Sequence, residues 1–226
     1  ISIRESILRA VSHDLRTPLT AISGAVSVLL SSPEVSEKNL AMLADIKQDA
    51  DGLIVMVENL LSVTRVQDGT MPLKKREEML EEVAGDALLT TRRRFPDCHV
   101  ELDLSEDILY LPMDPILIKQ VMVNLLENAI RHSGDTEHIR MRLYREGDWA
   151  VVEVRDQGRG LSPEVRRAIR AGEAMPLSGD ATRGMGIGLS VCQSIIKAHG
   201  GFFTAENHRE GGAVFRFGLP TEEEKL

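Results

Sequence analysis

Apolar residues recur along the N-terminal part of the chain, mostly at four-residue steps. This spacing places them on one face of an α-helix. The run ends near Ser31-Ser-Pro33, where serines and a proline favour a turn. The apolar positions are Ile3, Ile7, Val11, Leu15, Ile22, Val26 and Leu29. The pattern predicts a long amphipathic helix that begins at Ile3.

A second apolar pattern follows the turn and ends at Asp68-Gly69. Its steps alternate between three and four residues, which is typical of a coiled-coil seam. The positions are Leu43, Ile46, Ala50, Leu53, Val57, Leu60 and Thr64. Two helices joined by a short turn cannot cover both faces of such seams, so a second copy is expected to complete a four-helix bundle. Residues 1–69 are therefore predicted to form an all-α helical hairpin that dimerises.

After Met71-Pro72 the pattern changes to alternating strands and helices, which predicts a second domain over residues 70–226. The non-periodic segment 172–186, with glycine, methionine and proline, is expected to be a mobile loop. Strands are expected at 73–75, 99–104, 109–113, 138–144, 150–155, 202–207 and 213–219, and helices at 80–93, from 114, and at 187–199. The predicted fold is an α+β sandwich with helices on one face of a mixed sheet.

Composition narrows the function classes. The chain has 226 residues and a formal net charge of −8, which disfavours nucleic acid as a partner. Cys98 and Cys192 lack any metal-ligand spacing, and a reducing compartment fits them best. No apolar run approaches the ~20 residues of a membrane span. We therefore expect a cytoplasmic fragment without membrane contact. Because its helical pattern begins almost at the first residue, we also expect it to be a piece of a longer protein.

The helix expected from Asp114 carries a polar stripe on an otherwise apolar pattern. Gln120, Asn124 and Asn128 repeat at four-residue spacing, with Arg131 and His132 one turn further. A solvated face is one interpretation. The other is a pocket in which amides hold a hydrated Mg²⁺ and arginine meets phosphate.

Two glycine motifs follow. Asp156 comes directly after a predicted strand and can accept a hydrogen bond from an exocyclic amine, while Gly158 and Gly160 allow close backbone approach. The sequence GMGIGL at 184–189 begins a predicted helix, whose free N–H groups suit an anion. Each motif alone is as common in turns as in sites.

Their order is specific. NLLENAIRHS, VRDQGRGLS and RGMGIGLSVC, about thirty residues apart, resemble the N box and two glycine boxes of sensor histidine kinases, within the gyrase, Hsp90 and MutL ATPase fold. VSHDLRTPLT near the N-terminus resembles their phosphoacceptor box. SHDLRTPLT, NLL, LKK and NLLENA together resemble the potassium-responsive Kdp sensor kinases, which implies the cytoplasmic domain of a membrane-anchored bacterial sensor and a role in potassium or osmotic signalling.

The resemblance implies ATP and Mg²⁺ as cofactors. Asn128 would coordinate Mg²⁺ with help from Asn124, Arg131 would touch the phosphates, and His132 would lie near the nucleotide. Asp156 would bind the adenine amine. The residues that would shape the pocket and its lid are Gly158, Gly160, Arg183, Gly184, Gly186, Gly188 and Leu189.

Two departures bear on activity. Hydrolysing members of the fold carry a glutamate at the position of Asn124, so transfer to a protein nucleophile is favoured over ATP hydrolysis. The stretch 165–182 lacks the family's lid aromatics. The alternative hypotheses are a hydrolytic ATPase and a dimeric binding module of weak nucleotide affinity or phosphatase-biased scaffold.

The phosphoacceptor box supplies the nucleophile. His13 lies two residues from both Val11 and Leu15, about 200° around the helix, so it is expected to face solvent. Asp14 is the adjacent carboxylate suited to act as general base. The predicted activity is an ATP-dependent protein-histidine kinase that autophosphorylates His13 and passes the phosphoryl group to an aspartate in the receiver domain of a response regulator.

Three further residues of the box have expected roles. Thr17 resembles the threonine that positions water when these kinases dephosphorylate their partner. Arg16 is expected to assist with phosphate. Pro18 removes a backbone donor and is expected to bend the helix beside the site.

The helical hairpin predicts a homodimer. Sedimentation equilibrium of the 226-residue chain should give twice the mass of one chain, because exposed apolar seams favour association. A stable monomer at micromolar concentration would contradict the four-helix bundle.

Overall fold

The computed structural model describes residues 3–31, 36, 39–40, 42–44, 46–47, 50–51, 53–54, 73–105, 107–133, 138–171 and 185–222. Side chains are described from Leu15 in the first helix, except that of Arg16, and from Gly188 in the last helix. The chain divides into two compact units, Ile1–Met71 with Gly179–Gly188 and Pro72–Ser178 with Leu189–Leu226. They are described in turn.

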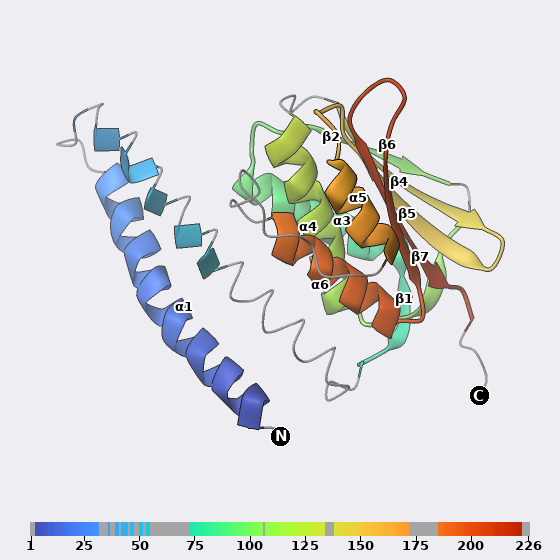
Figure 1. Cartoon of the computed structure of the whole chain (residues 1–226), viewed down its shortest axis with the longest axis horizontal. Helices are drawn as coiled ribbons and strands as arrows, with labels where there is room; N and C mark the ends of the chain where they lie inside the picture. Colours follow the sequence, from blue (N-terminus) through green and yellow to red (C-terminus); the bar gives the residue numbers. More distant parts are fainter. Residues whose placement is uncertain are drawn as a thin grey trace. The chain divides into compact units, whose positions relative to one another are not determined.

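The first unit contains the long N-terminal helix α1 (Ile3–Leu30), which continues through Pro18 (Figure 1). The first predicted helix is therefore confirmed. Helical residues within 39–54 follow it, and Ser23 Oγ donates a hydrogen bond of 2.6 Å to Asp51 Oδ1. Lys47 Nζ lies 2.7 Å from the other oxygen of Asp51. The later positions of the second seam, Val57, Leu60 and Thr64, lie outside the described residues.

The second unit is built on a mixed five-stranded sheet. Its spatial order is β2-β4-β5-β7-β6, in which only the β2–β4 pair is parallel. A separate antiparallel pair joins β1 to β3. The strands are β1 (Arg76–Met79), β2 (Val100–Leu104), β3 (Tyr110–Met113), β4 (Ile139–Glu146), β5 (Trp149–Arg155), β6 (Phe202–Asn207) and β7 (Ala213–Pro220).

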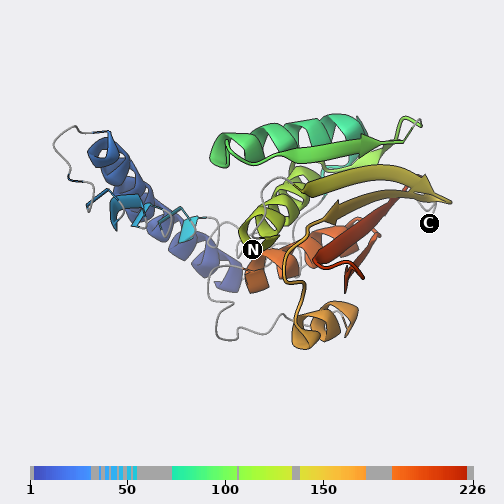
Figure 2. The ribbon, with the colours of Figure 1, turned by 90° about the horizontal axis from the view of Figure 1, so that it is seen from above.

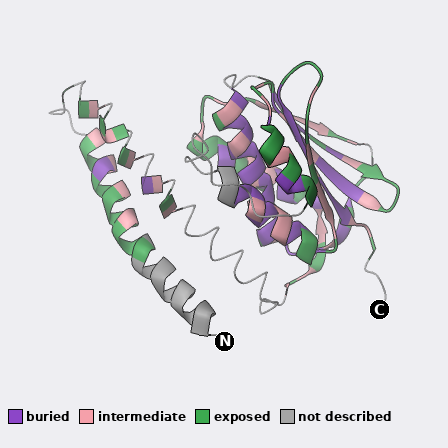
Figure 3. Cartoon of the chain, in the orientation of Figure 1, coloured by how far each residue is buried: buried purple, intermediate pink, exposed green. Residues whose placement is uncertain are grey.

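Helices cover one face of this sheet (Figure 1). They are α3 (Leu80–Arg94), α4 (Pro115–Ser133), α5 (Pro163–Ala171) and α6 (Met185–Ala198). In Figure 2, α4 and α6 lie between α3 and α5. Along β4, Ile139, Met141 and Leu143 are buried while Arg140 and Arg142 are exposed (Figure 3). This alternation is expected for a sheet with one covered and one open face, and it confirms the predicted sandwich.

The prediction was wrong at two places. Residues 73–75 are not a strand, because pairing with β3 begins only at Arg76, opposite Met113. The helix α5 was not predicted, since only Ala168 and Ile169 among its residues are buried and no apolar period is visible. Residues 172–184 of the expected mobile loop lie outside the described residues, and α6 begins at Met185.

A buried junction connects the start of α4 to the end of α6. Asp114 caps α4, since its Oδ1 accepts hydrogen bonds from the backbone N–H groups of Ile116 and Leu117 at 3.2 and 3.3 Å. Its Oδ2 accepts one of 3.1 Å from the backbone N–H of Lys74. The backbone N–H of Asp114 itself donates to His199 Nε2 at 3.1 Å. Asp114 therefore links Lys74, near the start of the unit, to the first turn of α4. Through His199 it also links α4 to the end of α6.

His199 makes these contacts as a neutral imidazole. Its Nδ1 lies 2.8 Å from the carbonyl oxygen of Ile195, so the hydrogen belongs on Nδ1 and Nε2 is the acceptor. Burial lowers the pKa of His199 from its ordinary value, and the charge of Lys75 lowers this pKa further, against opposing effects of the Ile195 carbonyl and Asp114. Protonation of Nε2 would remove the acceptor for the Asp114 N–H.

Acid should therefore destabilise this unit. Because the pKa of His199 is lower in the folded chain than the ordinary ~6.5, the unfolded chain binds the proton first and stability falls as pH drops below that value. Urea unfolding is followed by fluorescence of Trp149, the only tryptophan, which lies in β5. His199→Gln should cost about 1–3 kcal/mol at pH 7.5 and lose less between pH 7.5 and 5 than the wild type.

The exposed His99 offers a matched control. His99→Gln should retain the pH dependence of the wild type. Equal pH dependence in wild type and His199→Gln would show that the junction does not titrate.

Candidate functional site

Two asparagine side chains of α4 carry buried amide nitrogens that lack hydrogen-bond partners among the described residues. Asn124 is 8% exposed, and Asn128 is half-buried one helical turn later. The Nδ2 atoms of both have no hydrogen-bond partner among the described residues. Buried polar groups are nearly always paired, because an unmade bond costs about 1–3 kcal/mol. Two such amides on one side of a helix indicate a place for a ligand with polar atoms.

Cys192 of α6 is a buried neighbour of Asn124. The Cys192 thiol lies 3.9 Å from the carbonyl oxygen of Val121, to which it donates. Burial raises the pKa of this thiol to about 12, partly offset by a hydrogen bond with Asn124. Cys192 is therefore a protonated, unreactive thiol at neutral pH that packs α6 against α4.

Asp156 follows β5 and is buried, with 4% exposure. Its Oδ1 accepts two backbone hydrogen bonds, from Gly158 at 2.8 Å and from Ala213 at 3.1 Å. Its backbone N–H also donates to the Ala213 carbonyl at 3.0 Å. Among the described residues, none donates a hydrogen bond to Oδ2. The carboxylate is thus fixed through one oxygen and has the other available for a donor such as an amine.

The loop after Asp156 contacts the end of α4 at Gly158. A Cβ at Gly158 would lie 2.3 Å from the backbone oxygen of His132, so the loop approaches the end of α4 more closely than any other residue allows. Gly160 has a φ of +75°. Asn207 of β6 holds this turn, since its amide accepts from the Leu161 N–H at 2.7 Å and donates to the Leu161 carbonyl at 3.1 Å. Asn207 was not predicted, because it lies 46 residues from its partner in sequence.

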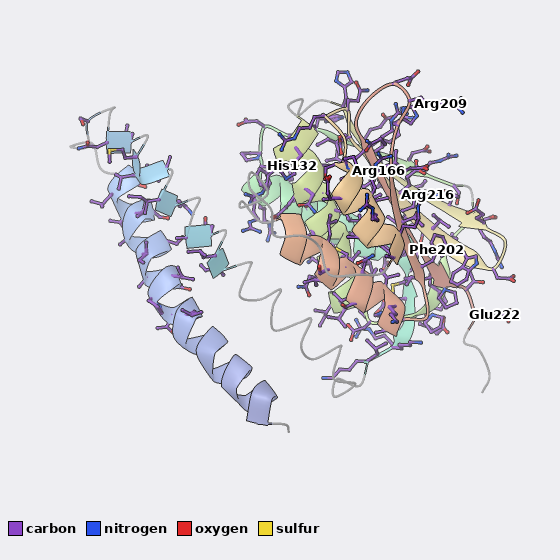
Figure 4. The ribbon with its side chains drawn as sticks, in the orientation of Figure 1. His132, Arg166, Phe202, Arg209, Arg216 and Glu222 are labelled. Atoms are coloured by element: carbon purple, nitrogen blue, oxygen red, sulfur yellow. The ribbon has the colours of Figure 1, made fainter. Side chains whose placement is uncertain are left out.

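His132 lies at the end of α4, as Figure 4 shows. Burial lowers its pKa from the ordinary value, and Arg159 and Arg131 lower it further while Asp156 raises it. Its Nε2 is buried without a hydrogen-bond partner among the described residues. His132 is therefore a neutral ring beside two arginines, with one nitrogen available to a ligand.

Arg131 is held by residues that the sequence analysis did not single out. Its Nη2 lies 3.8 Å from Oε2 of the buried Glu127, and its guanidinium carbon lies 5.6 Å from the centre of the Phe95 ring. Arg94 at the end of α3 binds the other oxygen of Glu127 at 2.5 Å. The i,i+4 spacing of Glu127 and Arg131 was visible in the sequence. The contribution of Arg94 was not.

The structure brings together only part of the predicted site. Asn124, Asn128, Arg131 and His132 share α4, and His132 meets the loop of Asp156, Gly158 and Gly160. Gly186, Gly188 and Leu189 lie at the start of α6, where Gly188 and Leu189 are buried. Arg183 and Gly184 lie outside the described residues, as do the side chains of His13, Asp14 and Arg16 in α1, whereas Thr17 is exposed.

These groups fit a ligand with an amine at one end and anionic oxygens at the other. Asp156 offers an acceptor, while the α4 amides and Arg131 offer donors. Among the described residues, no group of three or more His, Cys, Asp or Glu side chains could hold a metal ion.

Two family models match the chain. The His Kinase A (phospho-acceptor) domain matches residues 3–69. The Histidine kinase-, DNA gyrase B-, and HSP90-like ATPase matches residues 113–223. Together the two matches cover most of the chain.

Curated relatives are sensor kinases. The sensor protein KdpD of Clostridium acetobutylicum is 36% identical over 97% of this chain and 25% of its own length, and KdpD of Escherichia coli gives the same three values. The adaptive-response sensory kinase SasA of Synechococcus is 31% identical over 97% of this chain and 57% of its own length. The chain thus spans about a quarter of the KdpD proteins it matches.

Solved structures share the fold. The catalytic domain of histidine kinase ThkA is 27% identical, with a TM-score of 0.59 over 68% of this chain and 100% of that domain. Full-length ShkA, solved in complex with AMPPNP, is 21% identical, with a TM-score of 0.68 over 95% of this chain and 45% of its own. Matches to both kinase domains, in the order in which their motifs occur here, show that this chain belongs to the sensor histidine kinases.

Proposed function

We propose that this chain is the catalytic core of a two-component sensor that binds Mg-ATP, phosphorylates His13 and passes the phosphoryl group to a receiver-domain aspartate of a response regulator. The observation that carries this proposal is the buried Asp156, with Oδ1 fixed by two N–H groups and Oδ2 available. An oxygen so placed accepts a hydrogen bond from the exocyclic amine of adenine and rejects a base with a carbonyl there.

Nucleotide binding uses the residues around Asp156. Gly158 and Gly160 leave room for the base and ribose, with Gly186, Gly188 and Leu189 at the start of α6 and Arg183 and Gly184 before it. His132 lies beside the base-binding loop. Arg131 and the N–H groups at the start of α6 bind the phosphates.

Mg²⁺ fits the unpartnered amides of α4. Asn128 and Asn124 would hold it, since either amide can present its oxygen after rotation of the side chain. When bound, the ion neutralises charge on the phosphate oxygens. Asn124 occupies the position of the glutamate found in hydrolysing members of the fold, so no carboxylate there activates water.

Phosphoryl transfer follows from the box around His13. A ring nitrogen of neutral His13 forms a bond to the γ-phosphorus while the bond from that phosphorus to the bridging oxygen breaks, and ADP leaves. Asp14 accepts the proton from the other ring nitrogen. Arg16 assists with phosphate, and the exposed Thr17 positions water when the phosphorylated regulator is hydrolysed.

Dimerisation through residues 1–69 is supported by exposed apolar side chains on α1. Leu15, Ile22 and Leu29 recur at seven-residue steps and are 45–47% exposed. Such a heptad row is covered by a partner helix in helical bundles. We infer that residues 1–69 form the dimeric phosphotransfer domain and residues 70–226 the ATP-binding domain, with a receiver domain as the second partner and no nucleic acid.

The KdpD relatives support a place in potassium or osmotic signalling, as the cytoplasmic part of a membrane-anchored sensor. None of the helices among the described residues has the length and apolar character needed to cross a bilayer.

Autophosphorylation is tested by incubation with Mg²⁺ and γ-labelled ATP. Wild type should acquire acid-labile label, because a phosphoryl–imidazole bond hydrolyses in acid. His13→Gln should acquire none, and Asn128→Ala should lose at least 90% of the rate, roughly the effect of one lost ligand contact. Free phosphate without protein label would indicate the hydrolytic ATPase instead, and neither product would indicate the binding module.

Gly158→Ala should weaken nucleotide binding, because the new Cβ would lie 2.3 Å from the backbone oxygen of His132 and force the Asp156 loop away from α4. Calorimetric titration with Mg-AMPPNP measures the loss, expected to exceed tenfold. Gly85→Ala in α3 is the control, since nothing lies within 4 Å of its Cβ, and it should bind normally with up to about 1 kcal/mol more stability. Unchanged affinity in Gly158→Ala would remove this loop from the site.

A further inference from the structure

One buried carboxylate beside the site has no part in the mechanism above. Glu127 is 6% exposed and immediately precedes Asn128 in α4. Its Oε1 binds Arg94 Nη1 at 2.5 Å, and its Oε2 lies 3.8 Å from Arg131 Nη2. Two guanidinium groups from two helices therefore share one carboxylate.

The two contacts are unequal. The Arg94 contact is as short as a strong charge-assisted hydrogen bond, whereas the distance to Arg131 is too long for any hydrogen bond. Arg131 is attracted by the charge of Glu127 and by the Phe95 ring, with its guanidinium carbon 5.6 Å from the ring centre. Its N–H donors remain available for a stronger acceptor.

Around the axis of α4, Arg131 lies between Glu127 on one side and Asn128 on the other. Successive side chains on a helix are rotated by about 100°, so Arg131 lies about 40° from Glu127 on one side and about 60° from Asn128 on the other. The Glu127 side carries the contacts to Arg94 and Phe95 of α3 and its C-cap. The Asn128 side carries the unpartnered amides.

We infer that Glu127 is a positioning residue that holds Arg131 toward α3, in competition with the phosphates of the nucleotide. This inference rests on the proposed function, in which Arg131 binds those phosphates. The competition makes nucleotide binding weaker than the site could support and eases the release of ADP. Arg94 limits the competition, because it occupies one oxygen of Glu127 and reduces the pull on Arg131.

The inference predicts opposite effects from the two residues of one ion pair. Glu127→Gln removes the competing charge and should tighten binding of Mg-AMPPNP and of ADP by about three- to tenfold. Arg94→Gln leaves Arg131 as the only cation beside Glu127, so the attraction of Glu127 for Arg131 increases. Nucleotide binding should then weaken by about threefold or more. A clamp that only joins α3 to α4 would be broken by either change, and both variants would then bind more weakly.

The experiment is calorimetric titration of the full 226-residue chain with Mg-AMPPNP and with ADP. The variants are Glu127→Gln, Arg94→Gln, Arg131→Gln and the double variant Glu127→Gln with Arg131→Gln. Glu101→Gln is the matched control, because it removes the charge of an exposed carboxylate whose ion pair with Arg140 lies on the sheet, and it should leave affinity unchanged. Trp149 fluorescence in urea checks that each variant is folded.

The double variant separates positioning from simple charge. If Glu127 acts through Arg131, Glu127→Gln should have no effect once Arg131 is replaced. Equal tightening in the presence and absence of Arg131 would overturn the inference, as would weaker binding by both Glu127→Gln and Arg94→Gln. Wild-type binding with no difference among variants would overturn only the inference, whereas absence of wild-type binding would overturn the proposed function as well.

Discussion

Helix α4 packs an apolar face into the core and also carries the two asparagines of the candidate site. The site depends on this combination. Its apolar side chains, among them Ile118, Met122 and Leu125, are fully buried in the core of the sandwich. Asn124 and Asn128 are carried on the same rigid helix, with amide nitrogens that no described residue satisfies. Packing of the apolar face supplies the stability against which the unpaired amides are a cost. A ligand with polar oxygens would offset that cost by accepting hydrogen bonds from the two amides.

The junction at Asp114 fixes where this helix begins. One carboxylate caps α4 and holds the backbone of Lys74, while the adjacent N–H is bound by His199 at the end of α6. The hydrogen bond from the Asp114 N–H to His199 therefore links the start of α4 to the residue that follows α6.

The end of α4 is defined by backbone contact rather than by side chains. The Asp156 loop approaches His132 so closely that only glycine fits at position 158, and Asn207 holds the same loop from β6.

The open face of the sheet carries ion pairs between neighbouring strands. Asp103 meets Arg142 and Glu153 meets Arg216 across neighbouring strands, which stabilises the strand register without apolar burial.

The sequence by itself determined most of the helices and strands and predicted the chemistry of the site. The sequence predicted α1 and α3 nearly to their ends and α4 at its start, where Asp114 and Pro115 favour the beginning of a helix. The order of the asparagine and glycine motifs identified the family. Local pattern failed for α5, whose arginines and few buried residues give no period.

Tertiary structure alone decided which distant groups meet. Arg94 lies 33 residues before Glu127, Asn207 lies 46 after Leu161, and His199 lies 85 after Asp114. Periodicity reports which face of an element is apolar, but the partner of a buried charge or amide depends on how whole elements pack. For that reason the sequence could predict Arg131 as a phosphate ligand, while the ion pair between Glu127 and Arg94 became visible only in the fold.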